Sequence, residues 1–320
     1  MHVEVLAPGL MTTVQDAGRA GHRHLGVGTA GALDAHSHAI ANLLVGNAVD
    51  APTLEITLAG PRLHFDRATQ IAICGADIDA RAGEVAIPMW RPVLLPADTT
   101  LALNACRRGA RAYLAVAGGF AVACTLGSTS TDLRGGFGGL EGRALAAGDV
   151  LEITRSRAIE TDQLRMASWW IDPAPDLEFA SPTIVRVIAG SDATHPDDAL
   201  FAHEWRVASA SDRQGLRLEG EALQPTDARE RLSEPVAPGT IQLPPDGRPI
   251  VLLADAQTHG GYPRIGHAIR ADWPRLAQLR PGDALRFIPS TRDAARQAQC
   301  EQAQRLARIA LAIAARRPDR

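Results

Sequence analysis

The sequence predicts a mainly β protein made of two β-barrel domains, with a few short helices and a helix at the C-terminal end. Short apolar segments recur about every 8 to 12 residues between Gly, Pro and Asp turns, which is typical of barrels and sandwiches. The chain of 320 residues is longer than most single cores. In addition, its two halves share short motifs, so two related domains are expected.

The first half contains the clearer pattern of strands. A short strand is expected over residues 2–6, ended by the Pro8-Gly9 turn. Residues 34–44 are expected to form a helix, with Asp34 as its N-cap and an apolar face on Ile40, Leu43 and Leu44. The other strands of this half are expected at residues 54–58, 62–65, 70–74, 93–95, 99–103, 111–116 and 150–153.

A charged, proline-bearing segment with Trp169-Trp170 then separates the halves. The second half begins with an expected strand at residues 183–189, and the Ala/Arg/Gln-rich residues 291–316 are expected to be helical. We therefore predict a first barrel over residues 1–155 with a Ser/Gly-rich loop, a linker over 156–182, a second barrel over 183–289 and a helical tail over 290–320.

The repeat between the halves is weak but ordered. LEI and GPRL, within residues 54–63, resemble LRLEGEAL at residues 216–223. AGDVL at residues 147–151 resembles PGDAL at residues 281–285, and in each a Gly-Asp turn precedes an expected closing strand. Two related barrels are consistent with this pattern.

Composition excludes several classes of function. Only 4% of the residues are aromatic and the net charge is −3, which argues against a nucleic-acid partner. The four cysteines stand far apart without zinc-ligand spacing, so we expect reduced thiols and no metal. No signal peptide and no 18-residue apolar run is visible. A cytoplasmic protein with a small-molecule substrate and protein partners, and without a membrane segment, is expected.

Residues 26–31, GVGTAG, match the G-x-G-x-x-G pattern of dinucleotide loops. Residues 20–25 before it are polar, however, where a buried parallel strand should stand. Glycines in a tight turn before a helix explain the match better.

Two polar loops of the first half are candidates for a site. Residues 10–19 include Gln15, Asp16 and Arg19, which either satisfy their own backbone or point at a polar ligand. Residues 118–143 are rich in Gly, Ser and Thr, and form either a surface loop or a nest for an anion.

Two segments of the second half are also candidates. In residues 209–220, Arg213 and Arg217 either hold a carboxylate or pair with Asp212 and Glu219 at the surface. Residues 239–266 contain an apolar strand whose end presents polar groups beside paired glycines. The candidates at that end are Asp255, Gln257, Thr258 and Tyr262.

Taken together, four blocks carry a family resemblance. They are GLMTTVQDAGRAGHRHLGVGTAGALD at residues 9–34, ANLLVGN at 41–47, GGF, LGSTSTDLRGGFGG and EGRALAAGD within 118–149, and SDRQGLRLEG with GTIQLPPDGRPIVLLADAQTHGGYPRIG in the second half. The chain resembles the family of 5-oxoprolinase C subunits, whose relatives are also described as biotin-dependent carboxyltransferases or allophanate hydrolase subunit 2. It departs from the pattern at His259, where a small hydroxyl residue is expected. The resemblance implies two cyclophilin-like β-barrel domains.

The resemblance also implies a function. It is the ATP-dependent opening of 5-oxo-L-proline to L-glutamate, carried out with two further proteins, the directly bound B subunit of 5-oxoprolinase and its A subunit. ATP would be used by the complex, and no cofactor bound by this chain alone is evident, so the chain is expected to be inactive alone. One alternative is a carboxyltransferase acting with a biotin carrier on urea or an amide. Another is a regulatory protein of the kind that inhibits a histidine kinase.

Under the main hypothesis the polar loops of both halves would meet in one cleft. Asp16, Asp212 or Asp255 would act as general base or position the substrate. Arg213 or Arg217 would neutralise the substrate carboxylate, and Ser128, Thr129 and Ser130 would bind an anionic intermediate. The full set of predicted substrate-binding residues is Gln15, Arg19, Asn42, Ser128, Thr129, Ser130, Arg213, Arg217, Gln257, Thr258 and Tyr262.

Overall fold

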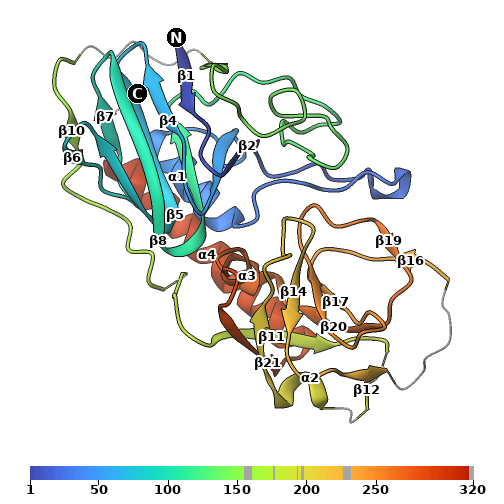
Figure 1. The fold of residues 1–320 in the computed structure, drawn as a ribbon. Helices are drawn as coiled ribbons and strands as arrows, with labels where there is room; N and C mark the ends of the chain where they lie inside the picture. The colour runs from blue at the N-terminus through green and yellow to red at the C-terminus, as the bar shows by residue number, and fades with distance from the viewer. Residues whose placement is uncertain (155–160, 176, 193, 196–197, 226–231, 317–320) are drawn as a thin grey trace. The chain divides into compact units, whose positions relative to one another are not determined.

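The computed structural model describes the chain except residues 155–160, 176, 193, 196–197, 226–231 and 317–320. Parts of the predicted linker and the end of the predicted tail therefore lie outside the described residues. The chain divides into two compact units (Figure 1). The first unit contains residues 1–19, 30–177 and 304–320, and the second contains residues 20–29 and 178–303.

The first unit is built on one ten-stranded antiparallel sheet with the path β10-β7-β5-β8-β4-β1-β9. Three further strands pair off this path, β2 with β3, β3 with β8 and β6 with β5. The strands are β1 (His2–Ala7), β2 (Met11–Gln15), β3 (Thr53–Thr57), β4 (Arg62–Phe65), β5 (Thr69–Ala82), β6 (Val85–Ala86), β7 (Val93–Leu95), β8 (Thr99–Val116), β9 (Val150–Glu152) and β10 (Arg165–Met166).

Two strands of this sheet are longer than predicted. The expected strands at residues 99–103 and 111–116 are the two ends of the single strand β8, and the expected strand at 70–74 is the first part of β5. β5 and β8 pair along their length, with register shifts between Gly75 and Ala80. Such bulges bend a strand without ending it, so the polar stretch that suggested a loop is instead part of the ladder.

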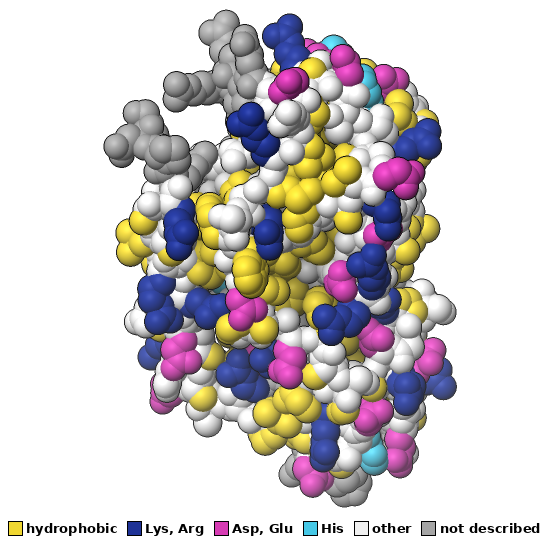
Figure 2. Space-filling model, turned by 90° about the vertical axis from the view of Figure 1, so that its left-hand side faces the viewer, with side chains coloured by type: hydrophobic (Ala, Val, Ile, Leu, Met, Phe, Trp, Pro, Cys, Tyr) yellow, Lys and Arg dark blue, Asp and Glu magenta, His cyan; other side chains and the backbone are white. Residues whose placement is uncertain are grey.

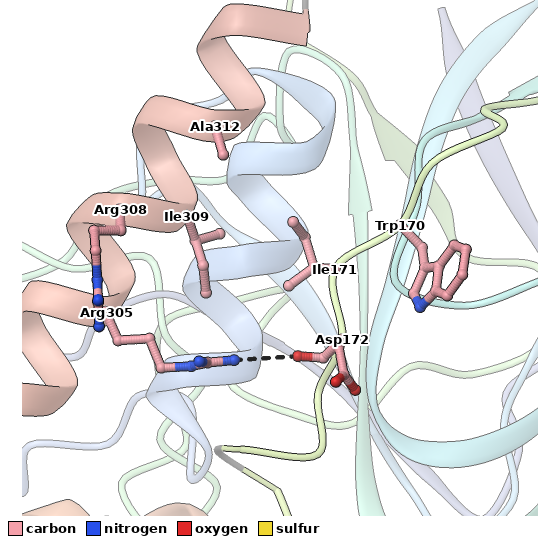
Figure 3. A pocket seen from close by; sticks show the side chains of 7 residues that line it. All are labelled: Trp170, Ile171, Asp172, Arg305, Arg308, Ile309 and Ala312. Carbon is pink, nitrogen blue, oxygen red and sulfur yellow. Dashed lines mark hydrogen bonds between the residues drawn. The ribbon is translucent and has the colours of Figure 1, made fainter.

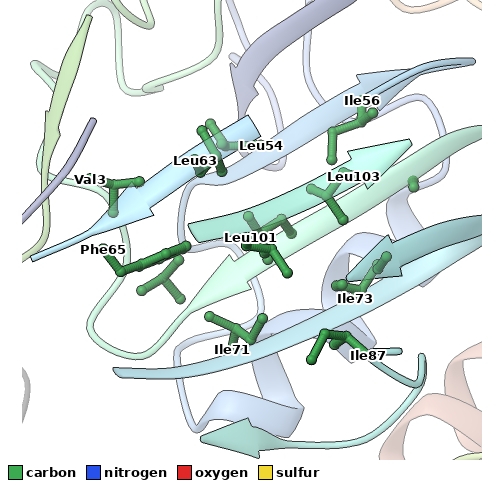
Figure 4. Packing of buried hydrophobic residues seen from close by; sticks show 14 of the residues in the cluster. Val3, Leu54, Ile56, Leu63, Phe65, Ile71, Ile73, Ile87, Leu101 and Leu103 are labelled. Atoms are coloured by element: carbon green, nitrogen blue, oxygen red, sulfur yellow. The ribbon is translucent and has the colours of Figure 1, made fainter. Parts of the chain in front are cut away.

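The core of the first unit lies on one face of the sheet (Figure 4), and alternating residues of the strands supply it. Helix α1 (Ala35–Val45) packs against β5 and β8. As predicted, Asp34 caps this helix by accepting the amide of Ser37 at 2.9 Å, and Gly46 ends it in the left-handed conformation. His36 and His38 of this helix are buried.

The second unit contains a closed barrel in the order β11-β20-β17-β18-β14-β13-β21. Its strands are β11 (Thr183–Ala189), β13 (Glu204–Val207), β14 (Gly215–Glu219), β17 (Thr240–Gln242), β18 (Ile250–Leu252), β20 (Arg264–Ala268) and β21 (Ala284–Pro289). The pair β11 and β21 is parallel, and the other pairs of the barrel are antiparallel. Trp205 of β13 is wholly buried, and its Nε1 donates to the Leu200 carbonyl at 3.1 Å.

Smaller elements complete the second unit. β12 (Thr194–His195) pairs with β15 (Gln224–Pro225), and β16 (Glu234–Pro235) pairs with β19 (His259–Gly260). The helical elements are η1 (Arg23–Leu25), α2 (Ala199–Ala202), η2 (Arg270–Asp272) and α3 (Trp273–Ala277). The predicted C-terminal helix is confirmed as α4 (Arg292–Arg316), whose residues are shared between the two units. The prediction of a mainly β chain is confirmed as well.

The two Gly-Asp turns have the same hydrogen bonds in both units. The Asp149 carboxylate accepts the amide of Ala146 at 2.7 Å, and the Asp283 carboxylate accepts the amide of Arg280 at 2.8 Å. The preceding glycines, Gly148 and Gly282, have φ of 87° and 88°. The turns precede β9 and β21, as the sequence repeat predicts.

Candidate functional site

Asp16 lies directly after β2, and its carboxylate is surrounded by donors from the serine/threonine segment 128–130. Its Oδ1 accepts the Ser128 hydroxyl at 2.6 Å and the Ser130 hydroxyl at 2.5 Å. Its Oδ2 accepts the Thr129 amide at 2.6 Å and the Thr129 hydroxyl at 2.9 Å. The amide of Gly18, at 2.7 Å from Oδ1, adds a fifth donor.

These donors determine the charge of Asp16. Burial by itself would raise the pKa of the carboxyl group, but the bonds from Ser128, Ser130, Thr129 and Gly18 outweigh it and hold the pKa below its ordinary value. The carboxylate is therefore ionised and fully occupied. A general base needs a raised pKa and a free oxygen, so the geometry fits the positioning role that the sequence left open for Asp16 rather than the basic one.

The hydroxyl groups of residues 128–130 already form hydrogen bonds within the protein, so they are not available to donate to a ligand. The three hydroxyl protons of this segment are donated to Asp16. Its other amides are also bonded, that of Ser128 to the Thr125 carbonyl at 3.3 Å and that of Ser130 to the Ser128 hydroxyl oxygen at 3.0 Å. The amides of residues 129 and 130, which were candidates for an anion-binding nest, therefore form hydrogen bonds to groups of the protein.

Gln15 and Asn42, whose side-chain amides were predicted to bind the substrate, form hydrogen bonds within the protein. The wholly buried Gln15 donates to the Thr13 hydroxyl at 3.0 Å and to the Thr131 carbonyl at 3.2 Å, and its Oε1 accepts the amide of Gly31 at 3.1 Å. Asn42, also wholly buried, donates to the Ala51 carbonyl at 2.7 Å. Both amides fasten chain segments to one another.

Arg19 is the buried cation of this region. It is 1% exposed, and its Nη2 donates to the Ser130 carbonyl at 2.6 Å. Its Nε points at the Thr125 carbonyl at 3.5 Å, and its guanidinium lies over the ring of Phe137, 4.7 Å from the centroid. Nη1 is buried and has no hydrogen-bond partner among the described residues.

A second buried polar group of the first unit was not predicted. Glu55, within β3, accepts the Tyr113 hydroxyl at 2.8 Å and the Leu33 amide at 2.9 Å. The Tyr113 oxygen in turn accepts the Asp34 amide at 2.8 Å, so the network fixes the start of α1. Burial raises the pKa of Tyr113, with the charge of Glu55 adding to the effect. A carboxylate inside the apolar run LEI was the available sequence signal.

His38 belongs to the same buried region. It is 2% exposed, and its Nδ1 is 2.9 Å from the Thr53 hydroxyl. Burial lowers its pKa to about 4, against the opposing charges of Asp16, Glu55 and Asp50. The imidazole is therefore neutral near pH 7.

In the second unit, Arg213 and Asp255 form a buried, two-point ion pair. Arg213 Nε is 2.8 Å from Asp255 Oδ2, and Arg213 Nη2 is 2.9 Å from Asp255 Oδ1. The side chains are 2% and 4% exposed. The sequence made Arg213 or Arg217 a candidate for the substrate carboxylate and Asp255 one of three candidates for a general base or a positioning group; in the structure Arg213 and Asp255 are bonded to each other.

Their neighbours Asp212 and Arg217 are exposed. Asp212 accepts the amide of Gln214 at 2.7 Å and so closes the turn before β14. Arg217 lies on β14, where its neighbours Leu216 and Leu218 face the interior. Arg213 lies in the bend before β14, so it is outside the alternation of the strand, and the two arginines that the sequence could not distinguish have different environments.

Gln257 joins three segments of the second unit. Its Nε2 donates to the buried Gln242 Oε1 at 3.2 Å, and its carbonyl accepts Arg23 Nη2 at 3.0 Å. Thr258 is buried, with its hydroxyl 3.0 Å from His259 Nδ1, while Tyr262 is 46% exposed. Sequence reasoning missed Arg23 and Gln242. Gln242, which lies on β17, directly follows the apolar Ile241, and this polar residue beside an apolar one was the available sequence signal.

A pocket of about 330 Å³ lies elsewhere on the first unit (Figure 3). Its lining comes from the segment after β10 and from α4, and Arg305 Nη2 donates across it to the Asp172 carbonyl at 3.3 Å. None of the predicted site residues lines it. The lining residues are Trp170, Ile171, Asp172, Arg305, Arg308, Ile309 and Ala312.

The described residues include no cluster of three or more His, Cys, Asp or Glu side chains placed to hold a metal ion. All four cysteines are free. Within the same described part, no helix is long and apolar enough to cross a membrane. The face in Figure 2 carries basic and acidic side chains interspersed among hydrophobic ones.

Comparison with known proteins gives consistent matches. The family described as carboxyltransferase domain, subdomain A and B, matches residues 25–289. The chain is 40% identical over 308 residues to the 5-oxoprolinase C subunit of Escherichia coli, covering 94% of this chain and 95% of that protein. It is 34% identical to the 5-oxoprolinase C subunit of Haemophilus influenzae, with 89% and 90% covered. The structure of Kluyveromyces lactis urea carboxylase matches with a TM-score of 0.88 at 29% identity, covering 96% of this chain and 29% of that one.

Proposed function

Because the chain belongs to the carboxyltransferase domain family, subdomains A and B, we propose that it is the C subunit of an ATP-dependent 5-oxoprolinase. It would act with the B subunit, bound directly, and with the A subunit, in the cytoplasm, and would have little activity alone. The observation that carries the proposal is the 40% identity to the Escherichia coli C subunit over nearly the full length of both proteins.

The proposed reaction opens the lactam of 5-oxo-L-proline to give L-glutamate. A neutral amide carbonyl is a poor electrophile, so its oxygen must be activated before water attacks, and ATP supplies that activation in the complex. The part proposed for this chain is to hold and orient the lactam, because orientation and fixed hydrogen-bond donors lower the barrier without further chemistry.

The hydrogen bonds of the candidate residues favour two different roles, positioning of other groups and direct contact with the substrate. Asp16 with Ser128, Thr129 and Ser130, and Arg213 with Asp255, are proposed as positioning groups because their polar atoms are bonded within the protein. Gln15 and Asn42 act in the same way. Direct substrate contact is proposed for Arg19, whose Nη1 has no partner among the described residues.

The test is reconstitution. The purified A and B components of 5-oxoprolinase are assayed with and without this chain for release of glutamate and phosphate from 5-oxoproline and ATP. We expect turnover to depend on the chain and glutamate and phosphate to appear together. A rate that is the same with and without the chain would show that the proposal is wrong.

A second candidate is a carboxyltransferase that works with a separate biotin carrier. The match to Kluyveromyces lactis urea carboxylase over 96% of this chain favours it. Under this alternative, the chain would accelerate transfer of the carboxyl group of carboxybiotin to urea, measured with a carboxylated carrier protein. Acceleration in this assay and none in the 5-oxoproline assay would select it.

A further inference from the structure

Arg19 is a buried cation whose charge is not matched by a neighbouring carboxylate. Among the described residues, no Asp or Glu oxygen lies within 4.0 Å of its guanidinium. Arg213, by contrast, is equally buried and is neutralised by Asp255 at two points. Burying an unpaired charge is costly, so such a group usually has a partner that is charged and supplied from elsewhere.

The hydrogen bonds of Arg19 leave one specific nitrogen open. A guanidinium carries five N–H groups and no acceptor. Nη2 and Nε point at carbonyls of Ser130 and Thr125, which leaves both N–H groups of Nη1 without a partner within the described chain. An unsatisfied buried donor normally calls for an explanation such as a ligand.

Asp16 does not serve as the missing counterion, although it is only three residues away. Its two oxygens already accept five hydrogen bonds. Residues 128–130, which donate hydrogen bonds to Asp16, also bind Arg19, because the Ser130 carbonyl accepts a hydrogen bond from Arg19 Nη2. The loop therefore keeps the anion and the cation apart, and leaves the cation available.

The surroundings fix the guanidinium in position. Gly138 has φ of 73°, and a side chain there would come within 2.1 Å of the Ser130 carbonyl oxygen and 2.8 Å of Arg19 Nη2. Glycine thus lets the backbone approach the cation closely. The ring of Phe137 covers one face of the guanidinium, so an acceptor approaches Nη1 along the guanidinium plane.

We propose that Arg19 Nη1 is an anion subsite that takes the carboxylate of the substrate, the role that sequence reasoning gave to Arg213 or Arg217. A carboxylate fits because one of its oxygens can accept an N–H of Nη1 in a charge-assisted hydrogen bond, and because the carboxylate supplies the missing charge. The identity of the substrate as 5-oxoproline rests on the proposed function, whereas the preference for a carboxylate rests on Arg19 alone. Because Nη1 is closed off from solvent, binding requires the glycine-flanked turn at Phe137 to move.

Two matched pairs of probes test the subsite on the full chain in complex with the B subunit. 5-Oxo-L-proline is compared with 2-pyrrolidinone, the same lactam without the carboxylate, and acetate is compared with acetamide. Dissociation constants are measured by calorimetry or ligand-observed NMR. We expect the wild type to prefer the carboxylate of each pair at least tenfold, as a charge-assisted bond gives.

Arg19→Met should remove the preference, and Arg19→Lys should keep part of it, because it retains the charge but loses the planar donors. Arg67→Met, at an exposed arginine of the same unit, is the matched control and should keep the preference.

If Arg19→Met does not fold, a full wild-type preference in Arg19→Lys overturns the proposal. It is also overturned if Arg19→Met keeps the preference, or if the wild type binds neither carboxylate more tightly than its neutral analogue. The acetate pair separates this outcome from failure of the proposed function, because it requires neither a lactam nor turnover.

Discussion

The loop around Asp16 and Arg19 in the first unit and the Arg213–Asp255 pair in the second use the same two buried residue types in opposite ways. In the second unit, the arginine and the aspartate neutralise each other at 2.8 and 2.9 Å. In the first unit, neutral hydroxyls and amides surround the aspartate, while carbonyls and a ring hold the arginine. A closed pair has no capacity left for a ligand, whereas a separated pair does. The comparison therefore supports the proposal that Arg19, rather than Arg213, binds a substrate.

The largest effect is expected from breaking the closed pair. Asp255→Ala removes the carboxylate that pairs with the buried Arg213 at two points, so we expect the free energy of unfolding to fall by about 3–5 kcal/mol. Urea unfolding followed by circular dichroism measures the loss. Asp212→Asn, at the exposed neighbouring carboxylate, is the control and should stay within about 0.5 kcal/mol of wild type.

A double substitution sharpens this result. Replacing both partners by apolar residues, as in Arg213→Met with Asp255→Leu, removes both buried charges and should recover most of the lost stability. Recovery identifies the pair as structural. A double variant as unstable as Asp255→Ala would mean instead that Asp255 contributes through other bonds.

The next effect concerns the response of the first unit to acid. The pKa of His38 is about 4 in the folded protein and near 6.5 in an unfolded chain, so the unfolded state binds more protons between these values. Its contribution is fully present above pH 6.5 and is lost as the pH falls to about 4. We expect a loss on the order of 3 kcal/mol over this window.

Unfolding measured from pH 7 to 4 in wild type and His38→Gln checks this expectation. The variant should show a shallower decline with falling pH, since its side chain does not titrate. His24→Gln, at an exposed ring, should decline as the wild type does. Parallel curves for wild type and His38→Gln would contradict the neutral, buried state of His38.

A smaller loss is expected from Asp16→Asn. The change replaces an oxygen that accepts from hydroxyls by an NH2 group that cannot, so the segment 128–130 loses charge-assisted bonds worth about 2 kcal/mol. Because the folded-state pKa of Asp16 is lowered, its contribution is present above the ordinary value of 3.8 and is lost as the pH falls through the folded pKa. The stability difference between wild type and variant should therefore vanish below that value. A difference that persists in acid would assign the loss to packing.

Local structure could be predicted from the sequence where a local cause determines it. Asp34 and Gly46 mark the ends of α1 because capping and left-handed glycine act within a few residues. The Gly-Asp turns before β9 and β21 were predictable for the same reason. The extent of β5 and β8 was not, because bulges near Gly75 let pairing continue through residues that resemble a loop.

The site was predictable in its residue types but not in its pairings. The polar segments 10–19 and 128–130 were singled out separately, and the structure joins them through Asp16 and Ser128, which are 112 positions apart. A single sequence carries no information on such a pairing, so Asp16 and the hydroxyls were each assigned to a ligand rather than to each other. Arg213 and Asp255, 42 positions apart, were not predicted to pair with each other for the same physical reason.

The smallest expected change in the free energy of unfolding is that of a variant of Arg217, which the sequence could not distinguish from Arg213. Arg217 is exposed on β14, so Arg217→Gln should change the free energy of unfolding by less than about 0.5 kcal/mol. Arg213→Gln, four residues earlier, leaves Asp255 buried without its ion pair and should cost about 3–5 kcal/mol. The same urea experiment on both variants measures the contrast. Equal losses would show that the two arginines contribute alike to stability, and would contradict the distinction between a buried ion pair and a surface cation in the second unit.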